Sequence, residues 1–217
     1  MRPLYRTVWI ASLLAILGMS CLFLMQPPAM PVVAPMVVYV SDDKSLSLQY
    51  PGNWKLHDYS SHAVAGRVAF DPNANTHFGV DTSMAGSLMG DIAKSNNDML
   101  SSLPGMPAAA AAKMRSPLEM LHEASLHAMA KNKRRFSDFV PGATQPMQVG
   151  GSDALATEFT FRQGAVWGKK EMIGTYVTIL TKEREVMLTA TCSQDHAKTL
   201  KPVFDRMIAS LRFGQGG

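Results

Sequence analysis

Histidines are the residues of this chain best suited to metal binding and acid–base chemistry, and their spacing limits what they can do. A zinc pair on one helix face needs a spacing of about four residues, but His122 and His127 are five apart and fall on different faces. His57 and His62 lie in a polar segment with Asp58, where the alternatives are a loose, loop-borne metal site and two solvated histidines. We interpret both as solvated loop histidines and expect no metal-binding residues in the chain.

The sequence offers no candidate nucleophile. Ser87 lies in the segment GSLMG, 86–90, but it follows the first glycine directly and therefore fails the GxSxG spacing of a nucleophile elbow. Cys192 alternates with apolar residues in a strand-like segment, so we expect it to be buried and inert. Because a glycine-rich phosphate loop is also missing, we predict that the protein is not an enzyme and has no catalytic residues, no cofactor-binding residues and no cofactor.

Methionine is abundant, with 16 residues, and thioethers bind Cu(I). Six methionines lie in the central part of the chain, five to ten residues apart, which favours a role in packing over a copper site. These six are Met84, Met89, Met99, Met106, Met114 and Met120.

The segment KNKRR, 131–135, concentrates positive charge at the end of a predicted helix, where cations complement the helix dipole. It is either a solvated helix end or a contact surface for anionic lipid or an acidic partner. The residues of this candidate contact are Lys131, Lys133, Arg134 and Arg135. Beyond residue 30 the chain holds 19 basic against 17 acidic side chains, and this balance predicts no nucleic-acid partner.

The N-terminus predicts a membrane anchor. Residues 8–25 carry no charge and, as a helix, would span roughly 27 Å, enough for the core of a bilayer. Arg2 and Arg6 precede this run, so the positive-inside rule keeps residues 1–7 in the cytoplasm and the rest of the chain on the outer side. We favour a retained anchor; cleavage as a signal peptide and lipidation at Cys21 are the alternatives.

Between the anchor and the end of the chain we expect one domain. Residues 26–35 hold four prolines and predict a stiff linker, and the domain follows at 36–213. Residues 86–113 are rich in small residues and methionine without clear periodicity, so we expect a long mobile excursion within the domain.

Two helices are expected in this domain. Ser116, Pro117 and Glu119 have the spacing of a capping box with proline in the first turn, and they predict a helix that runs to about Lys131. A second amphipathic helix is expected to begin near Ser193 or Asp195 and to contain Pro202. Its apolar face is formed by Leu200, Phe204, Met207, Ile208 and Leu211.

Most of the remaining residues have strand patterns. Strands are expected at 36–40, 45–50, 66–70, 77–84, 153–161, 171–180 and 185–192. Because each helix has a single apolar face, we predict an α+β fold with a central antiparallel sheet flanked by helices on both faces, plus the one N-terminal transmembrane helix.

The segment SLQYPGNW, 47–54, gives this fold a family resemblance. Tyr50 ends an alternating strand, the Pro51–Asn53 segment forms a turn, and Trp54 lies where it can cover the end of a sheet. The arrangement resembles the PsbP family, a superfamily that also contains a Ran-binding nuclear import factor and bacterial envelope proteins. The segments VGGSDALATEFTF (149–161), EVMLTATC (185–192) and MIASLRF (207–213) are similar to its later strands and final helix.

The resemblance implies a PsbP-like α/β/α sandwich and a role as an accessory or binding subunit, without a shared catalytic site. We therefore expect a non-catalytic, membrane-anchored accessory or assembly protein, held in the cytoplasmic membrane by residues 8–25, with its domain in the periplasm or outside the cell. It would act by binding a protein partner in the envelope, through residues 86–113 or the 131–135 run. The alternative is a periplasmic carrier of a small ligand or metal ion.

Overall fold

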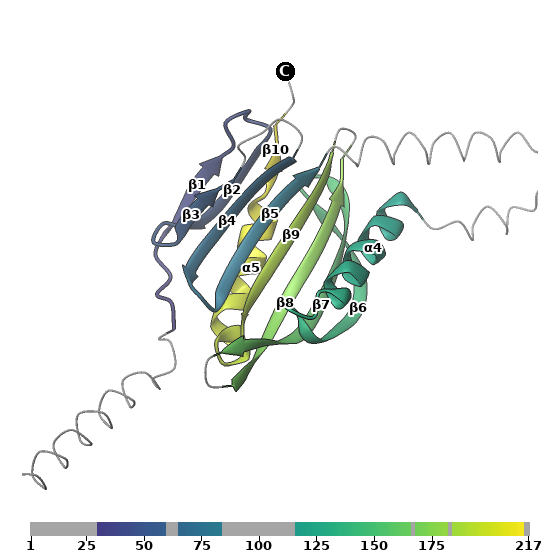
Figure 1. The fold of residues 1–217 in the computed structure, drawn as a ribbon. Coiled ribbons are helices and arrows are strands. Elements are labelled where there is room, and N and C mark those ends of the chain that lie inside the picture. The colour runs from purple at the N-terminus through teal and green to yellow at the C-terminus, as the bar shows by residue number, and fades with distance from the viewer. Residues whose placement is uncertain (1–29, 60–64, 84–115, 166–167, 182–183, 215–217) are drawn as a thin grey trace, which may run out of the picture. The chain divides into compact units, whose positions relative to one another are not determined.

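The structure is a computed structural model that describes residues 30–59, 65–83, 116–165, 168–181 and 184–214 (Figure 1). The chain divides into two units, Met1–Pro31 and Val32–Gly217, and every described strand and helix belongs to the second. The expected membrane span at 8–25 and the expected excursion at 86–113 lie outside the described residues. Within the part of the chain that the structure describes, no helix is long and apolar enough to cross a membrane.

The domain is built on an antiparallel sheet of seven strands (Figure 1). In spatial order its strands are β3 (Lys55–Asp58), β4 (Ala65–Asn73), β5 (Thr76–Ser83), β9 (Glu185–Ser193), β8 (Gly168–Leu180), β7 (Ser152–Ala165) and β6 (Ser137–Val149). The strands expected at 66–70 and 77–84 correspond to β4 and β5, and those expected at 171–180 and 185–192 correspond to β8 and β9; the two strands of each set are antiparallel neighbours in the sheet.

A smaller sheet contains β1 (Met36–Val40), β2 (Leu46–Pro51) and β10 (Arg212–Phe213). The sequence analysis assigned its first two strands to one central sheet, and this detail was wrong. The reason lies in the turn after β2, where the backbone N–H of Trp54 donates to the carbonyl of Pro51 at 2.9 Å. This turn redirects the chain, so β3 joins the edge of the larger sheet instead of continuing the smaller one.

The end of the predicted linker is tied to the same turn. The side chain of Asn53 donates to the carbonyl of Val32 at 2.6 Å and accepts from the backbone N–H of Ala34 at 3.1 Å. The backbone N–H of Gly52 donates to the carbonyl of Pro35 at 3.0 Å. The last residues before β1 are therefore held against the domain by hydrogen bonds.

One face of the larger sheet is covered by α5 (Ala197–Ser210), which follows the short 3₁₀ helix η1 (Gln194–His196). The predicted apolar face of this helix is confirmed, because all five of its residues, from Leu200 to Leu211, are buried. Trp54 is also buried and packs edge-to-face on Phe204, with ring centroids 6.0 Å apart. Cys192 is buried in the same core as predicted, and burial raises the pKa of its thiol to about 11, so the reactive thiolate is scarce at neutral pH.

The opposite face is covered by α4 (Pro117–Lys131), which packs on β6, β7 and β8 (Figure 1). The predicted capping box is present: Ser116 Oγ accepts from the N–H of Glu119, and the Glu119 carboxylate accepts from the N–H of Ser116. Beneath this helix lies a second apolar cluster, made of Phe136, Phe159, Phe161, Met172 and Tyr176. The α+β prediction with one helix on each face therefore agrees with the described domain.

Candidate functional site

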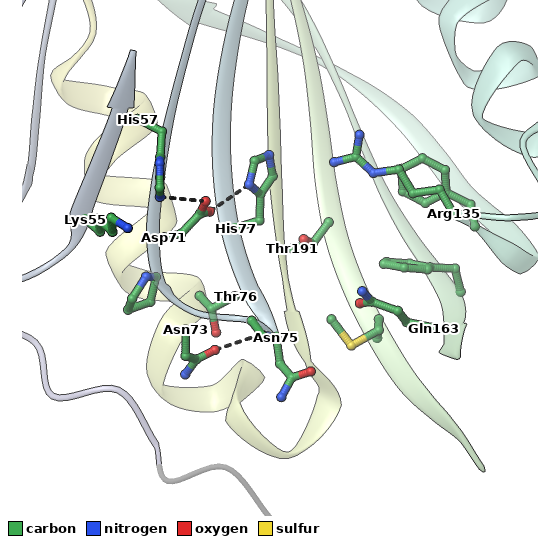
Figure 2. A pocket seen from close by; sticks show the side chains of 15 residues that line it. Lys55, His57, Asp71, Asn73, Asn75, Thr76, His77, Arg135, Gln163 and Thr191 are labelled. Atoms are coloured by element: carbon green, nitrogen blue, oxygen red, sulfur yellow. Dashed lines mark hydrogen bonds and ion pairs between the residues drawn. The ribbon is translucent and has the colours of Figure 1, made fainter. Parts of the chain in front are cut away.

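A pocket of about 480 Å³ opens beside this aromatic cluster (Figure 2). Strands β3, β4, β5 and β9 contribute side chains on one side, and Phe136, Phe161 and Met172 contribute apolar surface on the other. The polar side chains of its lining include Lys55, His57, Asp71, His77, Arg135 and Thr191. The pocket therefore joins a polar strand surface to the edge of an apolar core.

Asp71 lies between two histidines. Its Oδ1 is 2.7 Å from Nδ1 of His77, and its Oδ2 is 3.8 Å from Nε2 of His57 (Figure 2). The pairing between β4 and β5 shifts register between Phe70 and Asn73, and such irregularities bend a strand and change the direction of its side chains. The irregular segment of β4 thus presents Asp71 to histidines from both neighbouring strands.

The contact with Asp71 fixes how His77 can act. A carboxylate only accepts hydrogen bonds, so the proton of a neutral His77 ring resides on Nδ1, and Nε2 is left as an acceptor. Nε2 lies over Gly79, where a Cβ would stand only 2.8 Å away. The missing side chain of Gly79 therefore provides the space that the His77 ring occupies.

Arg135 forms the opposite side of the pocket. The guanidinium carbon lies 5.4 Å from the centroid of the Phe136 ring, within the range of a cation–π contact, and Phe136 itself is buried. Figure 2 shows the guanidinium extended over the sheet toward His77. Thr191 pairs with His77 across β5 and β9 and lies between the two groups.

The pocket is rich in hydrogen-bond donors and positive charge. Lys55 and Arg135 are cations, and Asp71 is the one carboxylate among the described residues that line the pocket. In the described part of the chain, no three His, Cys, Asp or Glu side chains are arranged to hold a metal ion. In His77 the nitrogen nearest the carboxylate is already used by a hydrogen bond to Asp71. The arrangement is therefore suited to binding a polar, negatively charged group.

Structural comparison identifies the fold. The solved structure of cyanobacterial PsbP (CyanoP) from Synechocystis sp. PCC 6803 matches over 88% of this chain and 99% of its own, with a TM-score of 0.55 and 11% identity. This chain has a PsbP-like fold. LpqN, involved in cell envelope biogenesis of Mycobacterium tuberculosis, matches with a TM-score of 0.46 and 14% identity over 83% of this chain and 91% of its own. No protein-family model matches the sequence, and no curated protein matches it.

The PsbP-like domain brings one member of the predicted basic run into the pocket. Lys131, Lys133 and Arg134 are exposed at the end of α4 and in the turn that follows, and none of them lines the pocket. Arg135 is the member that does. The run is thus divided between an exposed helix end and a pocket residue.

The structure changes the interpretation of two predicted histidine pairs. His57 is in strand β3 rather than in a loop, and its partner is Asp71, because β3 pairs with β4; His62 lies outside the described residues. The other acid of that segment, Asp58, accepts a hydrogen bond from the hydroxyl of Tyr39 at 3.1 Å. Burial, together with Asp58, raises the pKa of Tyr39 above its ordinary value of 10.0.

Of the second pair, only His122 is buried, and it does not reach the pocket. Its Nε2 contacts Oγ1 of Thr157 at 2.8 Å, and its Nδ1 contacts Oγ1 of Thr178 at 2.9 Å. His127 is exposed on the same helix. The two rings thus have separate environments, as their five-residue spacing predicted.

Asp71 and His77 are candidate functional residues that no motif in the sequence marked as a site; His77 was expected only as the first residue of a strand at 77–84. A usable signal exists in the segment HFGVD, 77–81, because His77 and Gly79 are two apart and share one face of a strand. A glycine in that position leaves room for the neighbouring ring.

Proposed function

We propose that the chain is a non-catalytic, membrane-anchored accessory or assembly protein of the cell envelope that acts by binding. Its PsbP-like domain would lie on the outer side of the cytoplasmic membrane. One observation carries this proposal: His57 and Arg135, far apart in the sequence and each within a segment that the sequence analysis singled out, line a single pocket. The pocket displays hydrogen-bond donors and positive charge, and these support a binding role.

A second candidate function is a carrier of a small ligand. Ligand pockets usually have volumes of about 300–1,000 Å³, and the volume of about 480 Å³ falls within this range. In this case the occupant would be a free small molecule, whereas an accessory protein would receive a group that belongs to its partner.

Site-specific photo-crosslinking in intact cells tests the proposal. A photo-reactive amino acid would replace Ala74, which is exposed and lines the pocket, and, as the matched control, Ala209, which is exposed on α5 at the opposite face of the sheet. We expect a discrete envelope protein to be crosslinked from Ala74 and not from Ala209.

Equal crosslinking from both positions, or none from either, would contradict a partner at the pocket. Native mass spectrometry of the full chain, extracted gently from membranes, then examines the carrier function. A bound molecule of defined mass, in the absence of a crosslinked protein, would favour the carrier.

A further inference from the structure

The donors of this pocket surround a space between His77 and Arg135, and their chemistry defines what fits there. We propose that the pocket binds the phosphate group of its ligand between these two side chains. This inference rests on the proposed function, because it specifies the chemical group that the binding domain receives.

Charge is the first argument. Lys55 and Arg135 carry two positive charges, and the single carboxylate, Asp71, is engaged by His77 and faced by His57. When Nε2 of His77 is protonated as well, Asp71 compensates the imidazolium and Nε2 becomes a donor. An incoming anion thus meets cations from β3 and from the segment after α4, while Asp71 remains satisfied within the protein.

The number and directions of the donors favour phosphate over a carboxylate. Arg135 provides a fork of N–H groups, His77 approaches from the other side of β9, and the hydroxyl of Thr191 lies between them. A carboxylate has two acceptor oxygens, whereas a phosphate ester presents three in a tetrahedral arrangement. Donors that approach from several sides therefore match a phosphate better.

The fold orients the two main donors, Arg135 and His77, before a ligand binds. Arg135 is held over the buried ring of Phe136, and the His77 ring is oriented by Asp71 and accommodated by Gly79. Donors that are oriented before the ligand arrives lose less conformational freedom on binding. A volume of about 480 Å³ also leaves room for more than the phosphate itself, so the group belongs to a larger molecule. Its source is either a soluble phosphate ester or a phospholipid head group.

Calorimetric titration of the purified full chain tests this inference. Glycerol 3-phosphate would be titrated into the chain in phosphate-free buffer and a detergent without phosphate. We expect one saturable site, with an affinity that falls at least tenfold in Arg135→Gln and in His77→Asn, because each variant loses a charge-assisted contact. Gly79→Ala should weaken binding as well, since its methyl group displaces the His77 ring. Acetate should not compete.

Lys133→Gln provides the matched control, because Lys133 belongs to the same basic run and lies outside the pocket. Its affinity should remain within twofold of the parent. Thermal unfolding of each variant verifies that it folds, and Arg135→Lys, which keeps the charge but loses the fork, replaces Arg135→Gln if that variant fails to fold.

The source of the phosphate is distinguished by repeating the titration in nanodiscs of phosphatidylglycerol. Loss of glycerol 3-phosphate binding there assigns the group to a lipid, and unchanged binding assigns it to a soluble ester; both outcomes support the inference. Absence of binding in detergent, equal competition by acetate, or equal affinities of Arg135→Gln and Lys133→Gln would overturn it. If the crosslinked partner persists without phosphate binding, the inference fails and the proposed function stands. If phosphate binds but no partner is crosslinked, the inference stands and the proposed function fails.

Discussion

His122 is a buried histidine whose hydrogen bonds join a helix to the sheet beneath it. Thr178 on β8 contacts one ring nitrogen, Thr157 on β7 contacts the other, and Thr144 on β6 extends the chain of hydroxyls with an Oγ1–Oγ1 distance of 2.7 Å. A hydroxyl can both donate and accept, so the neutral ring is fully satisfied in either tautomer. An imidazolium in the same place would need two acceptors and would be poorly solvated.

This environment predicts a pH-dependent stability. Burial lowers the pKa of His122 from the ordinary value of 6.5, so the unfolded chain binds the proton more readily than the folded one. The free energy of unfolding should therefore be fully present above about pH 6.5 and fall as the pH drops below it, with a slope of at most about 1.4 kcal/mol per pH unit. Urea unfolding of the full chain between pH 5 and 8, followed by circular dichroism, measures this slope.

His122→Gln serves as the comparison, since it keeps a polar side chain that does not titrate. We expect this variant to lose about 1–3 kcal/mol at neutral pH, from imperfect hydrogen bonds in a buried site. In this variant the free energy of unfolding should also depend less steeply on pH below about 6.5, because the titrating side chain is gone. A slope as steep as that of the parent chain would show that His122 is not its origin.

At the scale of elements, α4 is secured at its start by a capping box and at its centre by His122. Ser116→Ala removes the hydroxyl that accepts from the N–H of Glu119 and should reduce the free energy of unfolding by about 1 kcal/mol. Ser116→Asp keeps an acceptor at the N-cap and should retain most of the stability. Urea unfolding measures the free energy of unfolding of the parent and of the two variants. Equal values for the parent and Ser116→Ala would argue against a stabilising N-cap.

Elements with local signals were predictable from the sequence, and the two edge strands were not. The capping box and the alternating pattern of β9 depend on neighbouring residues, so they can be recognised without the rest of the fold. β6 contains Pro141 and Pro146, which read as breaks in a strand. Proline is compatible with an edge strand, but only the fold reveals that β6 is one. β3 is four residues long and polar, so it resembles a loop.

The pocket was harder to predict because it depends on register. His57 and Arg135 lie in segments that the sequence analysis singled out, but their proximity requires that β3 pair with β4 and that the turn after α4 reach the same face. Asp71 acquires its position from an irregular pairing between Phe70 and Asn73. Pro72 lies within that irregularity and is compatible with it, but proline alone does not specify how the two strands shift.

At the scale of the whole molecule, membrane attachment is the prediction to test. We expect the full chain to sediment with membranes, and a chain that lacks residues 1–25 to be released. Protease added outside the cytoplasmic membrane should digest the domain, because the positive-inside rule orients it outward. The mass of the purified chain and a Cys21→Ser variant distinguish a retained span from cleavage or lipidation. A domain protected from external protease would contradict the orientation.

The pairing of β10 with β2 has a consequence for how the domain is made. Phe213 pairs with Leu46, so a strand near the start of the domain is completed by the last strand of the domain. The pairing of β5 with β9 likewise joins distant parts of the chain. Contacts so far apart in sequence form slowly, and the pairing with β2 cannot form until β10 has been synthesised. If the chain is exported as we propose, its smaller sheet would be completed only after β10 had crossed the membrane.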